Sequence, residues 1–299
     1  MANSLTSTET VESGLKRIAL AEFTAINKQL RRFPAKKPVH EARKGLKKVR
    51  ALLRLVRPHI PGEEYRRQNR ICRDTARVLS ACRDEQVLDD TINNLMAGPL
   101  KAKGRALAPV WHGLKKARRS AEKGQKATLE ESRRGMQAVP VRFQRLKIQE
   151  TEWKALKAGI AVMYRQARAE SKEAGDDSPD ATLHEWRKSV KYLRLQLEFL
   201  EEAWPAVLHP LVKELHHLSN ALGEHHDLTV LCEALTDQSG KVAQPPEKLD
   251  WIYDAIAVSQ AKKKAEALAL GRRCFAEKPK AFQKRLAAYW QTWRRAEPA

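Results

Sequence analysis

The sequence predicts an all-α protein in which one helical bundle occurs twice. Nearly every segment between prolines and glycines carries apolar residues at helical spacing, and no stretch alternates as a β-strand would. A basic motif led by histidine reads VHEARKGLKKVRALLRL at residues 39–55 and LHEWRKSVKYLRLQLEF at residues 183–199. A second correspondence aligns VLSACRDEQVL at 78–88 with ALGEHHDLTVL at 221–231. Two matching segments in the same order in each half indicate an internal duplication.

The helix-breaking residues divide the chain into expected helices. In the first half these helices cover about 10–31, 37–57, 61–97 and 103–133. In the second half they cover about 149–174, 180–203, 206–238 and 246–272, and a final amphipathic helix covers about 280–295. Short connections make neighbouring helices antiparallel. We therefore expect a first bundle repeat, a second bundle repeat and a C-terminal helix, at 1–140, 141–275 and 276–299.

The charge of the chain narrows its partners. Lys and Arg total 57 against 36 Asp and Glu, which gives a formal net charge of +21 over 299 residues. Such an excess concentrates anions and speeds their association, so the expected partners are nucleic acid, anionic lipid or polymeric phosphate. The four cysteines lack metal-binding spacing, and neither a secretory signal nor an apolar run of about 18 residues is evident. We expect a cytoplasmic protein.

The repeated motif separates apolar and basic residues onto different faces of a helix. At about 100° per residue, each motif gathers its large apolar residues on one face. The expected core residues are Val39, Ala42, Leu46, Val49, Leu53 and Val56 in the first copy, and Leu183, Trp186, Val190, Leu193, Leu197 and Leu200 in the second. The basic rows are His40, Arg43, Lys44, Lys47, Arg50 and Arg54, and His184, Arg187, Lys188, Lys191 and Arg194. Like charges at this spacing destabilise a helix unless an anion is present.

A second basic row follows the first motif. It comprises Arg66, Arg70, Arg73 and Arg77, all on one face of the next expected helix. The aligned positions of the second half are His209, Lys213, His216 and Asn220, so that row is weaker. Beyond it, Arg83 aligns with His226 and Asp84 with Asp227. Two facing basic rows would line a groove spaced for an extended polyanion.

The motifs resemble those of the CHAD family, the conserved-histidine α-helical domain. The resemblance rests on HExRKxxKxxR-type segments at His40–Arg50 and His184–Arg194, and on LGxxRD-type segments at Leu79–Asp84 and Leu222–Asp227. It implies two four-helix bundles related by a pseudo-twofold axis, with a basic pore between them. It also implies binding of inorganic polyphosphate and recruitment to polyphosphate granules. The family usually places arginine where this chain has His226. No CYTH-type triphosphatase domain fits, so the chain resembles a stand-alone, non-catalytic member.

Within that resemblance each residue type has an expected role at polyphosphate. The expected binding residues are the basic rows of both motif helices together with Arg66, Arg70, Arg73, Arg77, Arg83, Lys213, His216 and His226. Arginines grip non-bridging oxygens in a fork, and lysines act as mobile point charges. Histidines near anions should protonate more readily, so affinity should rise as the pH falls toward 6. Glu41 and Glu185 either orient basic neighbours or simply pair along the helix. Asp84 and Asp227 cap a helix or tether a motif residue.

The sequence also allows other functions. A row of cations also attracts DNA or RNA, so nonspecific nucleic-acid binding is the main alternative. A zinc-protease helix would need a second histidine four residues after the first, which HExRK lacks, and neither metal nor cofactor is expected. Acidic ligands for a phosphate-chain hydrolase cannot be assembled from the motifs, so no catalytic residues are expected. The C-terminal helix either touches a membrane surface or packs against a bundle.

Overall fold

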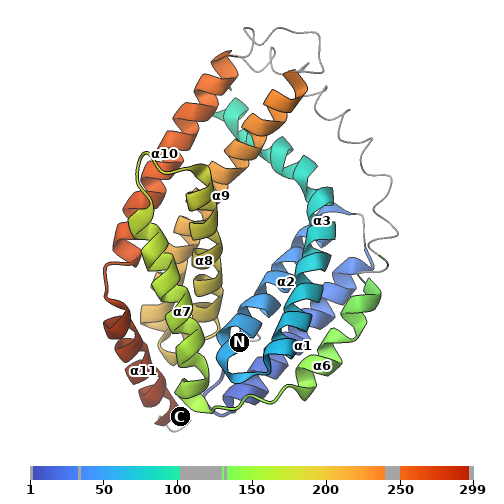
Figure 1. Ribbon diagram of the computed structural model, residues 1–299, viewed down its shortest axis with the longest axis vertical. Coiled ribbons are helices and arrows are strands. Elements are labelled where there is room, and N and C mark those ends of the chain that lie inside the picture. Colours follow the sequence, from blue (N-terminus) through green and yellow to red (C-terminus); the bar gives the residue numbers. More distant parts are fainter. Residues whose placement is uncertain (1–2, 33–34, 102–129, 131–132, 240–249, 296–299) are drawn as a thin grey trace.

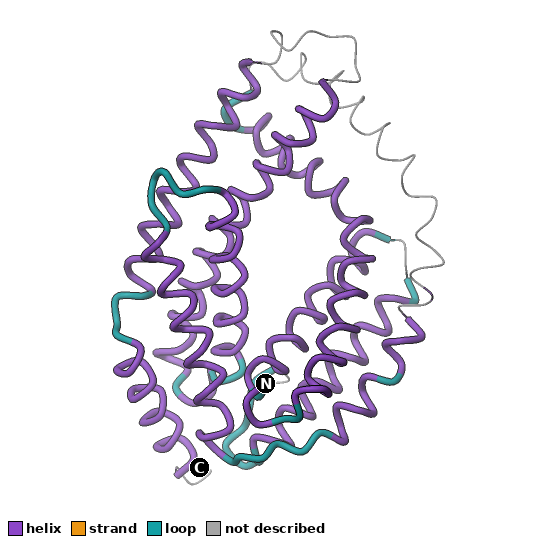
Figure 2. Tube along the Cα trace, viewed as in Figure 1, coloured by secondary structure: helices purple, strands orange, loops and turns teal. Residues whose placement is uncertain are grey.

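A computed structural model describes residues 3–32, 35–101, 130, 133–239 and 250–295, and these residues form helices and no strands (Figures 1 and 2). The first half contains α1 (Val11–Leu30), α2 (Lys36–Leu55), α3 (Gly62–Ala97) and α6 (Val139–Arg145). The second half contains α7 (Glu152–Glu173), α8 (Asp180–Glu198), α9 (Pro205–Ser239), α10 (Asp250–Cys274) and α11 (Pro279–Arg295). Two 3₁₀ turns lie at Arg57–His59 and Glu201–Ala203.

Most of the expected helices are confirmed to within a few residues. The expected helix at 103–133 falls almost wholly outside the described residues. The helix expected at 180–203 is shorter, since α8 ends at Glu198 and Pro205 begins α9. Trp204 is extended, with ψ 84°, because the ring of the following proline disfavours helical backbone. The short helix α6 was not predicted, because seven residues including a proline carry too little periodicity.

Consecutive helices pack against each other within each half. In the first half α2 lies between α1 and α3, and α6 packs against α1. In the second half α8 packs against α7 and α9, while α10 packs along α9. Figure 1 shows α2 and α3 on one side of the molecule facing α8 and α9 on the other. The two motif helices, α2 and α8, therefore occupy the inner positions of both halves.

The halves share one hydrophobic core where α2 meets α7 and α8. This core includes buried residues of both halves, among them Phe23, Leu46, Leu53, Tyr164 and Trp186. The backbones come closest at Gly159, where an added Cβ would lie 2.0 Å from the carbonyl oxygen of Leu55. Only glycine permits that approach.

A smaller core joins the halves again at the far end of α3. Leu88, Ile92 and Leu95 of α3 cluster there with residues of α9 and α10 such as Leu231 and Ile256. In Figure 1 this contact lies where α3 reaches α9 at the top of the view. Inter-half contacts at two separate places hold α2 and α3 at a fixed position relative to α8 and α9.

The C-terminal helix packs against the protein. Phe282, Leu286 and Trp290 of α11 are buried, and Phe282 stacks on Tyr164 of α7 with ring centroids 3.9 Å apart. This contact confirms the packed alternative for its apolar face. Among the described helices, none is long and apolar enough to cross a bilayer.

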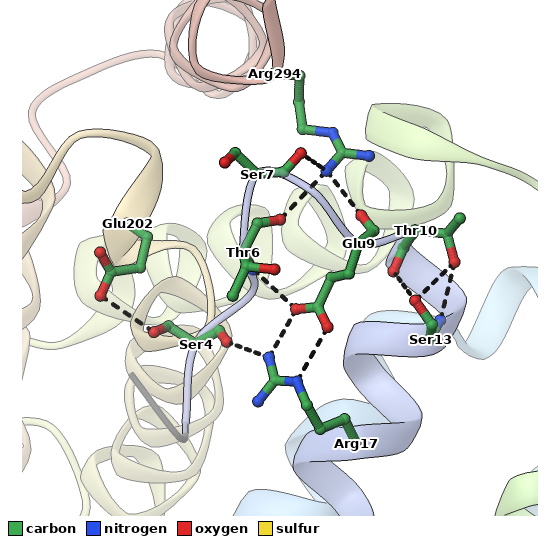
Figure 3. Close-up of polar contacts among 9 residues, drawn as sticks. All are labelled: Ser4, Thr6, Ser7, Glu9, Thr10, Ser13, Arg17, Glu202 and Arg294. Atoms are coloured by element: carbon green, nitrogen blue, oxygen red, sulfur yellow. Dashed lines mark hydrogen bonds and ion pairs between the residues drawn. The ribbon is translucent and has the colours of Figure 1, made fainter. Parts of the chain in front are cut away.

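Arg294 of α11 ties the two ends of the chain together (Figure 3). Its guanidinium donates to backbone carbonyls of the N-terminal segment, those of Thr6, Ser7 and Glu9. It also pairs with Glu152 at 2.8 Å. Glu152 has φ 49°, a left-handed conformation that non-glycine residues rarely adopt. The Glu9 carboxylate in turn accepts two hydrogen bonds from Arg17, at 2.6 and 3.0 Å.

Candidate functional site

The division of the motif helices into apolar and basic faces is confirmed. Every expected core residue of both motifs is buried, including Val49 in α2 and Trp186 in α8. The basic residues of the motifs are half-buried or exposed. Burial of one complete face fixes the rotation of each helix about its axis, and the basic row follows from that rotation.

The first arginine of each motif packs against the same place on the next helix. Arg43 donates to the carbonyl oxygen of Ala76 at 3.0 Å and to the hydroxyl of Ser80, both in α3. Its counterpart Arg187 lies against Gly223 of α9, where an added Cβ would be 3.1 Å from Nη2. Position 223 aligns with position 80, so the two halves use equivalent contacts.

In the second half, Asp227 of α9 lies close to Arg187, the same arginine that packs against Gly223. Asp227 Oδ1 lies 4.0 Å from Arg187 Nη1, which agrees with its expected tethering role. The side chains of Arg83 and Asp84 lie outside the described residues. Only the second-half tether is therefore visible in the structure.

The later arginines of the first motif connect the halves. Arg50 and Arg54 both donate to Asn69 Oδ1 of α3, at 3.0 and 3.1 Å. Arg54 also lies 4.0 Å above the ring of Tyr192, which belongs to α8. Desolvation in this contact lowers the pKa of Arg50. In the second motif Arg194 instead pairs with Glu198 at 3.0 Å.

The first lysine of each motif pairs along its own helix. Lys44 lies 3.4 Å from Glu41, and Lys188 lies 2.6 Å from Glu185. Both lysines are about half exposed, so these are weak surface pairs that an anion can replace. The later lysines, Lys47 and Lys191, and the first-motif histidine, His40, are half-buried on the same helices.

A histidine pair lies between α8 and α9. The rings of His184 and His226 have centroids 4.4 Å apart. Desolvation, with the nearby charges of Arg187, His184 and Lys191, lowers the pKa of His226 to about 4. Burial and the charges of Lys188 and Arg187 also lower the pKa of His184. The lowered pKa values favour the neutral form of both rings at pH 7; burial is the larger cause, and the neighbouring cations add to it.

The same effect extends along α9. Burial and the charge of Arg194 lower the pKa of His216, whose ring lies 3.3 Å from the amide of Asn220. Lys213 is exposed one turn earlier on the same helix. We expected these histidines to become protonated as the pH falls toward 6, and in the protein without a bound anion this expectation needs correction. Burial among cations holds these histidines neutral to lower pH.

The arginine row of α3 splits into two parts. Arg73 and Arg77 both pair with Asp74, at 3.0 and 3.6 Å. Arg66 and Arg70, farther toward the start of the helix, line a separate cavity of about 540 Å³. The motif helices therefore meet at Arg54 and Tyr192, and α8 meets α9 at the histidine pair, whereas part of the α3 row contributes to a different surface.

Sequence reasoning missed two features of this region. Tyr192 was not singled out, although it receives Arg54 from the other half. The cavity beside α3 also includes Arg67 of the same helix, and Arg134 and Arg142 on the opposite wall. The adjacent arginine pairs at 66–67 and 133–134 were the available signal. The described residues contain no group of three or more His, Cys, Asp or Glu side chains arranged for a metal ion.

Comparison with known proteins identifies the class. The model of the CHAD domain matches residues 17–236, so the chain belongs to the CHAD family. The fold resembles the CHAD domain from the plant Ricinus communis, with TM-score 0.61 and 16% identity over 93% of this chain and 96% of that one. It also resembles PptA from Streptomyces chartreusis, with TM-score 0.59 and 16% identity over 92% of this chain and 100% of that one. No curated protein sequence matches the chain.

Proposed function

We propose that the protein binds inorganic polyphosphate non-covalently, along the basic residues of α2 and α8 and the facing parts of α3 and α9. The observation that carries this proposal is the matched packing of the two motifs. Arg43 and Arg187 occupy equivalent contacts, so both halves place the first arginine of their basic rows in the same way. Membership of the CHAD family supports the same ligand.

The proposal includes an architecture. We infer two four-helix repeats, expected from the sequence at 1–140 and 141–275, with a C-terminal helix at 276–299. Because α6 (Val139–Arg145) packs against α1, we place the boundary after α6, a few residues later than expected. We further infer a basic groove or pore between the repeats; Figure 1 shows α2 and α3 facing α8 and α9 across the molecule. Polyphosphate carries about one negative charge per phosphate and no bases. A ligand of this kind needs a row of cations and gains nothing from a stacking platform.

Polyphosphate is favoured over nucleic acid by the use of the aromatic residues. Trp186 is buried, and the Tyr192 ring is occupied by Arg54. Proteins that hold single strands usually place exposed rings among their basic residues. The proposed role is therefore binding without catalysis, with recruitment of the protein to polyphosphate granules in the cytoplasm. Nonspecific RNA or DNA binding is the competing outcome.

The first experiment is competition binding across a salt series. Labelled long-chain polyphosphate is displaced by unlabelled polyphosphate, length-matched RNA and duplex DNA. Polyphosphate should win by at least about a hundredfold near physiological salt, because a flexible chain of closely spaced phosphates can neutralise many cations at once. Equal competition by all three polymers would replace the proposal with a generic polyanion surface.

A charge-reversed variant tests the location of the site. It carries glutamate at four basic positions of the motifs, Arg43, Lys47, Arg187 and Lys191. Its matched control carries glutamate at four exposed basic positions of α7 and α10, Lys154, Lys157, Arg272 and Arg273. The motif variant should lose most affinity and show a shallower salt dependence, whereas the control should change little. Equal losses in two folded variants would refute the location.

A further inference from the structure

A second basic surface lies between α3 and the segment that leads into α6. Among the described residues, its cavity of about 540 Å³ is lined by five arginines and a single acidic residue, Glu63. The arginines are Arg66, Arg67, Arg70, Arg134 and Arg142. Three of them come from α3, and Arg134 and Arg142 come from the opposite wall.

This cavity opens on a different side of α3 from the one that faces α2. Asn69, which receives Arg50 and Arg54 of α2, marks the side toward the motif helix. At about 100° per residue, Arg67 lies roughly 160° around the helix from Asn69. In Figure 1 α3 lies between α2 and α6. The arginine pocket is thus separate from the basic rows of the motif helices.

The arginines of this pocket keep their donors available. In the motif helices Arg43, Arg54 and Arg194 donate to acceptors of the protein itself. Across the part of the chain that the structure describes, no side-chain hydrogen bond or ion pair involves the guanidinium of any of the five pocket arginines. Four of them are exposed and Arg142 is half-buried.

Such an arrangement destabilises the protein unless an anion is bound. Arg66 and Arg70 are like charges at i,i+4, which weakens a helix. Glu63 supplies the one carboxylate that the described residues contribute to the cavity wall. Guanidinium groups present planar forks that match phosphate oxygens, and two walls of arginines can grip neighbouring phosphates from both sides.

We propose that this arginine pocket is a second anion site that binds short linked phosphates, such as a di- or triphosphate group. The group is either a free small molecule or the end of a longer phosphate chain. A cavity of about 540 Å³ suits a compact ligand, whereas an extended polymer suits the motif rows. The pocket does not depend on the proposed function of those rows.

The test uses tripolyphosphate as the probe and isothermal titration calorimetry as the readout. The motif rows are first weakened by Arg187→Gln with Lys191→Gln, so that the remaining binding reports the pocket. Adding Arg67→Gln and Arg134→Gln should weaken this binding at least about tenfold, because each loses a charge-assisted hydrogen bond. The matched control adds Arg145→Gln and Arg272→Gln, which remove the same charge at exposed positions outside the pocket. It should change affinity less than about twofold.

The outcomes separate the two sites. Equal weakening by the pocket and control pairs would overturn the pocket, as would complete loss of tripolyphosphate binding in the motif variant alone. Unchanged binding of long-chain polyphosphate by the motif variant would instead count against the motif rows and leave the pocket standing. Binding of tripolyphosphate and of long-chain polyphosphate to the pocket is then compared at equal concentration of chain ends. This comparison shows whether the natural ligand is a free small molecule or the end of a longer chain. Equal occupancy indicates chain ends, and preference for tripolyphosphate indicates a free small molecule.

Discussion

If the protein binds polyphosphate as proposed, the histidine pair should make that binding depend on pH. In the free protein the pKa of His226 is about 4, because the ring is desolvated beside Arg187 and other cations. A bound phosphate chain supplies negative charge that opposes this effect, so binding raises the pKa. Protons are then taken up on binding, and affinity rises as the pH falls. The direction of this pH dependence follows from the lowered pKa of His226 in the free protein.

The size of the effect can be worked from the two states. If the bound anion returns the pKa of His226 from about 4 to its ordinary 6.5, one proton is linked to binding between these values. Relative to pH 8, affinity should then rise about fourfold at pH 6 and about thirtyfold at pH 5. The larger part of the increase therefore falls below pH 6.

The assay is calorimetric titration with long-chain polyphosphate at constant ionic strength, in two buffers of different ionisation enthalpy. Long chains contain few terminal phosphates, so their own titration contributes little. His226→Gln should remove most of the pH dependence, whereas His217→Gln, an exposed histidine on the same helix, should preserve it. Affinity that is flat from pH 8 to pH 5, without proton uptake, would refute the reasoning.

Three further predictions concern stability, measured by chemical denaturation. Gly159→Ala should destabilise the protein by about 3 kcal/mol or more, because its Cβ would overlap a backbone carbonyl of α2, and a native-like midpoint would contradict this crossing. Arg54→Ala and Tyr192→Leu should each cost about 1 kcal/mol but show clear coupling in a double-mutant cycle; additive effects would mean that the contact contributes nothing. Arg294→Ala should cost about 2 kcal/mol and speed amide exchange in the N-terminal segment and α11 together, whereas faster exchange in α11 alone would contradict the tie.

The local pattern of the sequence was enough for the helices and their buried faces. The six apolar residues of the first motif recur at helical spacing, and each is buried as expected. Such a stripe depends on a few neighbouring residues, so it can be read without knowledge of the fold. Helix α6 was missed because its position depends on packing against α1 and not on its own sequence.

Only part of the candidate site could be predicted from the sequence. The matching motif arginines were found because both copies carry them at one spacing. The arginine pocket was not found, because Arg67 and Arg134 are far apart in sequence and meet only through folding. The pKa of His226 was likewise inaccessible, since a basic motif indicates nearby charge but does not show how deeply a ring is buried.

The shared hydrophobic core of α2, α7 and α8 has a consequence for how the molecule can be divided. Although its sequence repeats, neither half holds a complete interior, and a fragment ending near residue 148 would expose the apolar residues that α7 and α8 cover. Two fragments expressed separately should therefore be weakly folded alone and should regain structure when mixed.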